Sequence, residues 1–152
     1  RERLNMTDAG EIEALVREKL RLVDLEDAYD RDPADLSGGM RKRVALARAI
    51  ITKPEIILYD EPTSGLDPVT SRTIDKLIDD LRIELKVTSV VVTHDLHSAL
   101  AIGTRIAMLH NGKVVEVAAP ADFVKSENEI VRGFLEAQYI TRRGAWEKQV
   151  KV

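Results

Sequence analysis

Apolar residues recur at helical spacing in residues 10–24 and 67–85, which predicts two amphipathic helices. Asp8, with a glutamate three residues later, is the predicted cap of the first helix. A basic, alanine-rich helix is predicted over 40–52, and Pro54 ends it because proline disfavours helical geometry at the preceding residue. The apolar stripe of the predicted helix at 67–85 is formed by Ile74, Leu77, Ile78, Leu81 and Leu85.

Two short apolar runs flank the helix at 67–85. Residues 55–60 (EIILYD) and 88–95 (TSVVVTHD) are nearly continuous in apolar side chains, which predicts strands buried on both faces. Because a helix separates them, the two strands form a strand–helix–strand unit and pair in parallel. The pattern therefore predicts an α/β fold with a mainly parallel sheet.

The last third of the chain predicts a hairpin among short helices. Asn111-Gly112 favours a tight turn between strands at 104–110 and 113–118. Short helices are predicted at 96–102, 120–125 and 127–139. A basic tail with Trp146 follows, and we interpret it as a surface-packed terminus or a contact for a partner subunit or lipid head groups.

Composition narrows the class of protein. The chain has 152 residues, 44% apolar and 32% charged, which is typical of a globular domain. A net charge of −3 argues against nucleic acid as a partner, and we interpret the basic clusters at Arg41–Arg43 and Arg142–Arg143 as solvated faces. The absence of cysteine excludes disulfides and suits a cytoplasmic protein. The apolar runs are too short to span a bilayer, so any membrane link is expected through a partner.

The first candidate site is the start of the basic helix, DLSGGM. A helix start favours an anion, because its backbone N–H groups and dipole present positive charge. Ser37 adds a hydroxyl, and Gly38 and Gly39 allow an anion to approach the backbone closely. This stretch predicts contact with a phosphate.

The second candidate site lies at the ends of the two predicted strands. Asp60 and Glu61 follow the first strand, where ligands bind in open parallel sheets. Asp60 is placed to hold Mg²⁺, and Glu61 to accept a proton from water, although a turn pair of acids is the alternative. His94 follows the second strand and can donate to a phosphate, unless it is a surface histidine or shares a metal site with His97.

The order and spacing of these motifs make the combination specific. Ser37 precedes Asp60 by 23 residues, and His94 follows Glu61 by 33 residues. Between them, SGLD (64–67) provides a tight turn, and its aspartate can cap the helix that follows. Four such motifs in one order point to a single family.

The chain resembles the C-terminal part of an ATP-binding-cassette (ABC) transporter ATPase domain, which has a P-loop NTPase-like core. LSGGM resembles the family signature, IILYDE its Walker B strand, SGLD its D-loop and VVTHD its switch-histidine loop. The resemblance implies three regions. They are the end of the helical subdomain at 1–36, the catalytic core at 37–126, and a C-terminal helix and tail at 127–152.

The resemblance also implies a role for each motif. Asp60 would help to hold Mg²⁺, Glu61 would polarise the attacking water and His94 would bind the γ-phosphate of ATP. The signature would contact an ATP held by a second ATPase subunit in a head-to-tail dimer, through Ser37, Gly38 and Gly39. The D-loop would link the two sites across that dimer, through Ser64, Gly65 and Asp67.

The family's phosphate-cradling loop, G-x-x-x-x-G-K-[ST], does not occur in the sequence. The nearest Gly-Lys, Gly112-Lys113, stands in the predicted hairpin and is followed by valine. Without that loop the α- and β-phosphates lose their main backbone cradle. We therefore expect the 152-residue chain alone neither to bind ATP tightly nor to hydrolyse it at a useful rate, and its sheet to expose an apolar face.

Within the family, Met40 in the signature and the stretch RKRVALARAI are most similar to ATPases of Mla- or Mce-type lipid-trafficking importers. That similarity implies lipid transport, a membrane permease as partner, and a location on the inner face of the cytoplasmic membrane. Three alternatives stay open. They are a cassette ATPase for another cargo, a cassette protein not engaged in transport, and a non-enzymatic fragment that binds the dimer face of a full-length subunit.

Overall fold

The computed structural model describes the backbone of residues 7–147 and the side chains through residue 138. The chain folds as two compact units, Arg1–His94 and Asp95–Val152. The region boundaries expected after residues 36 and 126 stay a prediction.

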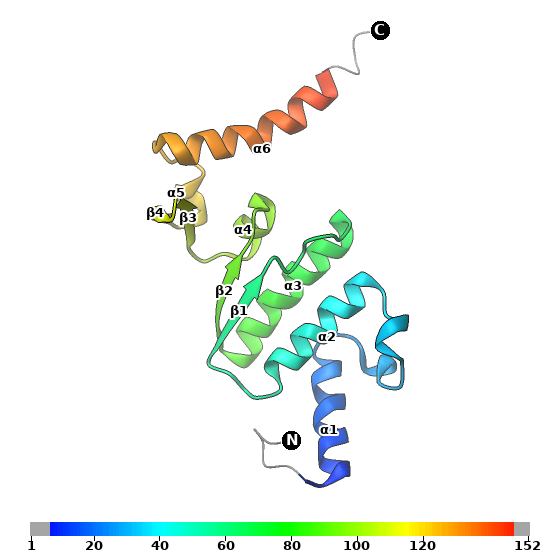
Figure 1. The fold of residues 1–152 in the computed structure, drawn as a ribbon. Coiled ribbons are helices and arrows are strands. Elements are labelled where there is room, and N and C mark those ends of the chain that lie inside the picture. Colours follow the sequence, from blue (N-terminus) through cyan, green and yellow to red (C-terminus); the bar gives the residue numbers. More distant parts are fainter. Residues whose placement is uncertain (1–6, 148–152) are drawn as a thin grey trace. The chain divides into compact units, whose positions relative to one another are not determined.

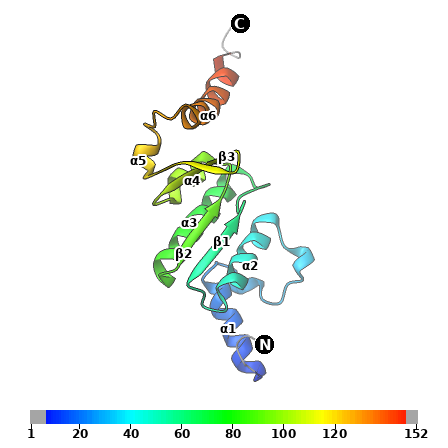
Figure 2. The ribbon, with the colours of Figure 1, turned by 60° about the vertical axis from the view of Figure 1, so that its left-hand side comes forward.

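The first unit contains the predicted strand–helix–strand arrangement (Figure 1). Its elements are α1 (Ala9–Arg21), η1 (Glu26–Ala28), η2 (Pro33–Asp35), α2 (Gly38–Ile50), β1 (Ile56–Asp60), α3 (Pro68–Leu85) and β2 (Thr88–Val92). β1 and β2 pair in parallel, in a register that runs from Ile56 opposite Thr88 to Asp60 opposite Val92. Figure 2 shows the two strands side by side with α3 running behind them. The prediction of a parallel pair joined by a crossover helix is confirmed.

Short polar side chains decide where the helices begin. Asp8 accepts a hydrogen bond from the Glu11 amide at 2.9 Å and caps α1, as the sequence predicts. Ser37 accepts from the Met40 amide at 3.2 Å, so α2 begins at Gly38, two residues before the predicted start. The two glycines of the signature are therefore helical residues, because the serine ahead of them satisfies an amide of the first turn.

The predicted apolar stripe of α3 forms the centre of the first unit's core. Four of its five members are buried, with exposed fractions of 1% for Ile74, Ile78 and Leu81 and 8% for Leu77. On β1, Ile57 and Tyr59 are exposed by 5% and 6%. Burial of the Tyr59 ring raises the pKa of its hydroxyl. Ile57 and Tyr59 lie on one face of the strand pair, the face that the helices cover.

The opposite face of the strand pair is exposed, so the prediction of strands buried on both faces is wrong. Burial alternates along β1, and four apolar side chains reach solvent: Ile56 by 59%, Leu58 by 76%, Val90 by 48% and Val92 by 58%. The reason is that helices of the described residues cover one side of these strands. The expectation of an exposed apolar sheet face is confirmed, and such a face favours association.

Leu58→Glu is expected to reduce self-association of the chain while changing the free energy of unfolding by less than about 1 kcal/mol, because the side chain is already in solvent. Sedimentation velocity over a concentration series, with urea unfolding of the same samples, measures both quantities. Ile57→Glu is the control on the same strand, and we expect it to unfold the protein because it buries a charge. Unchanged self-association in Leu58→Glu would contradict the exposed face as its cause.

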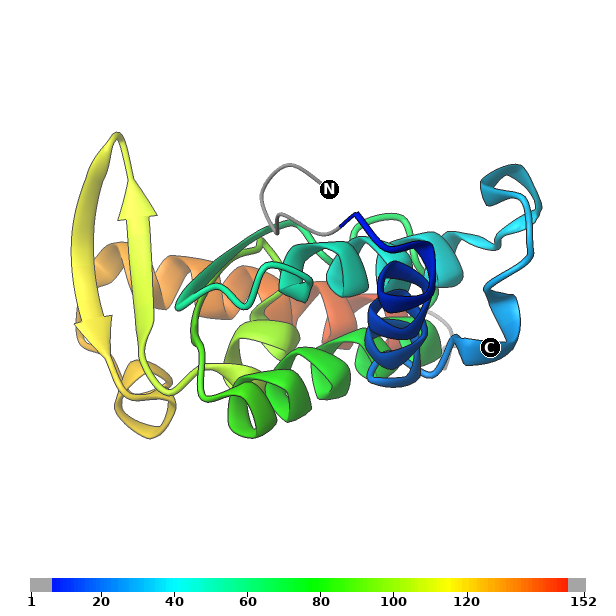
Figure 3. The same ribbon diagram turned by 90° about the horizontal axis from the view of Figure 1, so that it is seen from below.

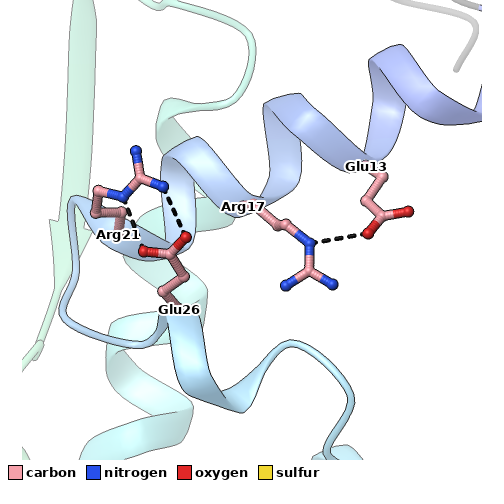
Figure 4. A network of polar contacts seen from close by, with 4 residues as sticks. All are labelled: Glu13, Arg17, Arg21 and Glu26. Atoms are coloured by element: carbon pink, nitrogen blue, oxygen red, sulfur yellow. Dashed lines mark hydrogen bonds and ion pairs between the residues drawn. The ribbon is translucent and has the colours of Figure 1, made fainter.

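A surface network ties α1 to the turn that follows it (Figure 4). Arg17 pairs with Glu13 at 2.8 Å and stacks over the Tyr29 ring at 4.0 Å from the guanidinium carbon. Arg21 binds both carboxylate oxygens of Glu26, at 2.6 and 2.8 Å. The hydrogen bonds from Arg21 hold the pKa of Glu26 below its ordinary value. This geometry fixes η1 against the end of α1.

The second unit is built around a hairpin. Its elements are α4 (Leu96–Ile102), β3 (Ile106–His110), β4 (Lys113–Ala118), α5 (Pro120–Phe123) and α6 (Glu129–Glu147). Asn111 and Gly112 have φ angles of 48° and 72°, so the predicted tight turn is confirmed. Figure 3 shows the two strands joined by this turn. The unit's core is formed by Leu96, Phe123, Val131 and Leu135.

The last helix is longer than the sequence predicts. It continues to Glu147 rather than ending near residue 139, so the basic stretch is helical in its backbone. The side chains of Arg142, Arg143 and Trp146 lie outside the described residues, and their roles stay predictions. Among the helices described here, none is both long enough and apolar enough to cross a membrane.

Candidate functional site

Glu61 and His94 meet at the carboxyl ends of the two parallel strands. β1 ends at Asp60 and β2 at Val92, and the Glu61 amide extends the pairing by donating to the Val92 carbonyl at 2.9 Å. Oε1 of Glu61 accepts a hydrogen bond from the His94 amide at 3.0 Å and lies 2.9 Å from His94 Nδ1. The structure thus brings together two side chains that are 33 positions apart in sequence.

The two oxygens of the Glu61 carboxylate have different surroundings. Oε1 makes both contacts with His94, whereas Oε2 is shielded from solvent and finds no hydrogen-bond partner within the described part of the chain. The Glu61 side chain is 34% exposed and that of His94 77%. A buried acceptor without a partner is rare in proteins and marks this carboxylate as unusual.

The backbone of Glu61 is strained. Its φ angle is 46°, a left-handed conformation uncommon for residues other than glycine. Pro62 follows it, and a residue before proline ordinarily prefers extended geometry. Such strain persists only where surrounding contacts hold it, and it occurs frequently at functional sites.

Asp60 is the last residue of β1 and is exposed. Mg²⁺ keeps several of its waters and takes one or two carboxylates from a protein, so a single exposed carboxylate at a strand end fits that ion. No group of three or more His, Asp or Glu side chains gathers as a metal site among the described residues. The alternative metal site at His94 and His97 therefore gains no further ligand there.

The second signature glycine packs closely against the start of α3. A Cβ on Gly39 would lie 2.7 Å from Cγ2 of Thr70, and one on Gly38 would lie 3.5 Å from Cδ2 of Leu66. Gly39 is buried, so a larger residue there would push α2 away from α3. Ser37 is exposed and caps α2. The close contact with Thr70 explains Gly39 as a packing residue. The contact of the signature with phosphate stays a prediction.

The D-loop residues form a turn and a helix cap. Gly65 has a φ angle of 77°, which glycine adopts without strain. The Ser64 amide donates to the Glu61 carbonyl at 3.2 Å, so this turn is joined directly to Glu61. Asp67 accepts from the amides of Val69 and Thr70 at 2.9 and 3.0 Å and from the Thr70 hydroxyl. Capping of α3 by Asp67 is confirmed, and its role across a dimer stays a prediction.

Asp67→Ala is expected to lower the urea midpoint of unfolding at neutral pH, because two amides of the first turn of α3 lose their acceptor. Hydrogen bonds from the hydroxyl and the amide of Thr70, and then from the amide of Val69, lower the pKa of Asp67. Its stabilisation is therefore complete above its ordinary pKa of about 4 and is lost as pH falls through the lowered value.

The difference between wild type and Asp67→Ala should accordingly shrink in acid, which urea titrations at a series of pH values measure. Asp80→Ala is the control on the same helix, because the Asp80 carboxylate makes an exposed ion pair with Lys76. It should shift the urea midpoint less than Asp67→Ala does. If the difference in urea midpoint between wild type and Asp67→Ala stays constant into strong acid, the carboxylate of Asp67 is not the cap.

The sequence predicts that the basic run Arg41–Arg43 is a solvated face, and the structure differs from this prediction. Lys42 and Arg43 are half-buried, and all three side chains donate to backbone carbonyls: Arg41 to Leu36, Lys42 to Glu61 at 3.0 Å and Arg43 to Asp24 at 3.3 Å. The sequence analysis did not identify Lys42 as a site residue. A lysine that binds a backbone carbonyl 19 positions away leaves no local sequence pattern.

Comparisons with known proteins find similarity to ATP-binding proteins of importers. Residues 3–64 match the family model described as ABC transporter. The chain is 40% identical over 122 residues to the methionine import ATP-binding protein MetN of Lactococcus lactis, covering 80% of this chain and 33% of that protein. It is 42% identical over 126 residues to the sulfate/thiosulfate import ATP-binding protein CysA of Halalkalibacterium halodurans, covering 82% and 35%.

A solved structure shares the fold. The ATP-binding cassette MJ0796, in a dimeric post-hydrolysis state bound to ADP and Pi, matches with a TM-score of 0.65 and 38% identity, covering 76% of this chain and 50% of that one. The chain thus spans about a third of the length of the curated relatives and half of this structure. These relatives are named for methionine and sulfate/thiosulfate import, and they do not support the expected lipid-trafficking type. The family match over residues 3–64, the structural similarity and the four ordered motifs show that the chain has the α/β fold of an ABC ATPase domain.

Proposed function

We propose that this chain contributes the hydrolytic half of the ATP-binding subunit of an ABC importer. The observation that carries the proposal is the contact of Glu61 with His94 at the ends of two parallel strands, with one carboxylate oxygen of Glu61 lacking a partner among the described residues. Ligands bind beyond the carboxyl ends of strands in such sheets. Phosphoryl transfer needs little more from a protein than positioning and charge stabilisation, and this pair of side chains is suited to both.

In this proposal Glu61 orients and polarises the water that attacks the γ-phosphate of ATP. Oε1 is engaged by His94, so the proposal assigns that water to Oε2, which has no partner among the described residues. His94 fixes the rotamer of Glu61 and, once ATP is bound, donates to the γ-phosphate. Asp60 would hold Mg²⁺, which supplies neutralisation of phosphate charge when bound.

Completion of the site requires a second ATPase subunit. We place the start of α2, at Ser37, Gly38 and Gly39, against an ATP held by that subunit in a head-to-tail dimer. The D-loop, with Ser64, Gly65 and Asp67, would lie at the same dimer face. The dimeric state of the structurally similar ATP-binding cassette supports this assignment.

For cargo we propose a small solute rather than a lipid. The identity to the methionine and sulfate/thiosulfate import proteins is nearly equal, at 40% and 42%, so it favours solute import without selecting between the two classes. A membrane permease would select the solute and hold the ATPase on the inner face of the cytoplasmic membrane. A net charge of −3 does not favour nucleic acid as a partner.

Reconstitution tests the function directly. The chain is mixed with a polypeptide that carries the P-loop half of a cassette ATPase, and phosphate release from Mg-ATP is measured for each component and for the mixture. We expect no release from this chain alone, since the sequence contains no G-x-x-x-x-G-K-[ST], and release from the mixture.

Two outcomes would contradict the proposal. A stable complex of the two polypeptides without ATPase activity would exclude the hydrolytic role. Inhibition of a complete cassette ATPase by this chain, without any rescue of the P-loop half, would favour the alternative of a non-enzymatic fragment that occupies a dimer face.

A further inference from the structure

The side chain of Lys42 joins α2 to the backbone of Glu61. Lys42 lies in the second turn of α2 and is half-buried. Its Nζ atom donates to the Glu61 carbonyl at 3.0 Å, across 19 positions of sequence. This contact connects the helix that begins with the signature to the residue that makes both contacts with His94.

The carbonyl that Lys42 binds belongs to the strained residue of the site. With a φ angle of 46° ahead of Pro62, Glu61 adopts a backbone conformation that its own preferences oppose. Its amide is held by the Val92 carbonyl at 2.9 Å. Its carbonyl accepts from the Ser64 amide at a longer 3.2 Å, so the charged donor supplies the shorter of the two contacts on that oxygen.

The orientation of this peptide decides where the Glu61 carboxylate lies. Oε1 is bound to the His94 amide and ring, and a rotation about the strained backbone would move the carboxylate away from both. We propose that Lys42 is a positioning residue, whose ammonium group holds Glu61 in its left-handed conformation and couples the start of α2 to the geometry of the Glu61 carboxylate. The catalytic part of this inference rests on the proposed function of Glu61 in hydrolysis.

Substitutions separate the donor from the packing of its stem. Lys42→Met keeps an unbranched stem and removes the ammonium group, whereas Lys42→Arg keeps a charged donor. Lys76→Met is the matched control, because Lys76 is an exposed lysine on α3 that pairs with Asp80. Urea unfolding verifies that all three variants are folded.

The first readout needs no ATP. Hydrogen exchange measured by NMR on the chain itself reports the His94 amide, which donates to Glu61 Oε1, and the Ser64 amide, which donates to the Glu61 carbonyl. We expect Lys42→Met to speed exchange of both amides about tenfold relative to wild type, with no such change in Lys42→Arg or Lys76→Met. Unchanged exchange in a folded Lys42→Met protein would overturn the proposal.

The second readout uses the reconstituted ATPase. We expect Lys42→Met to lower kcat by about 10- to 100-fold with KM for ATP nearly unchanged, because a displaced carboxylate affects the reaction and not binding. Lys42→Arg should recover most of the rate. Faster exchange together with an unchanged kcat would overturn the catalytic part of the inference.

Failure of the proposed function itself would look different. Wild-type chain would then show no ATPase activity on reconstitution, while the exchange experiment would still decide whether Lys42 holds Glu61. In an active enzyme, Lys42→Met added to Glu61→Gln should lower the rate no further, since both variants disable the same carboxylate. Additive losses would show that Lys42 acts elsewhere.

Discussion

Glu61→Gln is expected to reduce kcat of the reconstituted ATPase by about 100- to 10,000-fold, the usual contribution of a positioned general base. The amide retains the size and polarity of the carboxylate but cannot polarise water through a negative oxygen. KM for ATP should change little, because Glu61 is proposed to act on the water rather than on the nucleotide. Steady-state phosphate release over a range of ATP concentrations measures both constants.

A matched control is available next to the same strand. Glu55 precedes β1, is exposed, and lies six positions from Glu61, so Glu55→Gln removes the same charge without touching the site. We expect wild-type rates from it. Full activity in Glu61→Gln would remove Glu61 from the mechanism and with it the contact on which the proposed function rests.

Ile78→Ala is expected to lower the free energy of unfolding of the first unit by about 2–5 kcal/mol, the range for deleting a buried isoleucine side chain. Ile78 is 1% exposed, so the deletion leaves a cavity in the centre of the α3 stripe. Urea unfolding followed by far-UV circular dichroism measures the loss. Separate transitions for the two units would require each to be fitted alone.

The same helix offers the control. Ile83 is 58% exposed, and Ile83→Ala should change the free energy of unfolding by less than about 0.5 kcal/mol. Equal losses from the two substitutions would mean that the stripe of α3 is not the centre of the core.

Helices and turns were largely predictable because their signals are local. Capping by Asp8 and Asp67, the stripe of α3 and the Asn111-Gly112 turn depend on residues a few positions apart, and the structure bears out each of them. The extension of α6 beyond residue 139 was not predictable in this way, since the helix runs through Gly144 and glycine disfavours helix interiors.

The candidate site was predictable as a set of positions. A parallel pair joined by a crossover helix must bring the carboxyl ends of both strands to one edge, so Glu61 and His94 were expected at the same end of the sheet. Their hydrogen bonds and the strained φ angle of Glu61 were not expected, because both depend on the register of Asp60 opposite Val92.

The sequence by itself determined the order of the main helices and strands, the resemblance to ABC ATPases and the residues of the candidate site, because periodicity, caps and spaced motifs carry this information. Only the tertiary structure decided which face of β1 is covered, because an apolar run is the same whether one face or both are buried. It also decided that Lys42 binds the Glu61 carbonyl. A contact between residues 19 positions apart is set by how α2 packs beside the strand, and packing is a property of the whole chain.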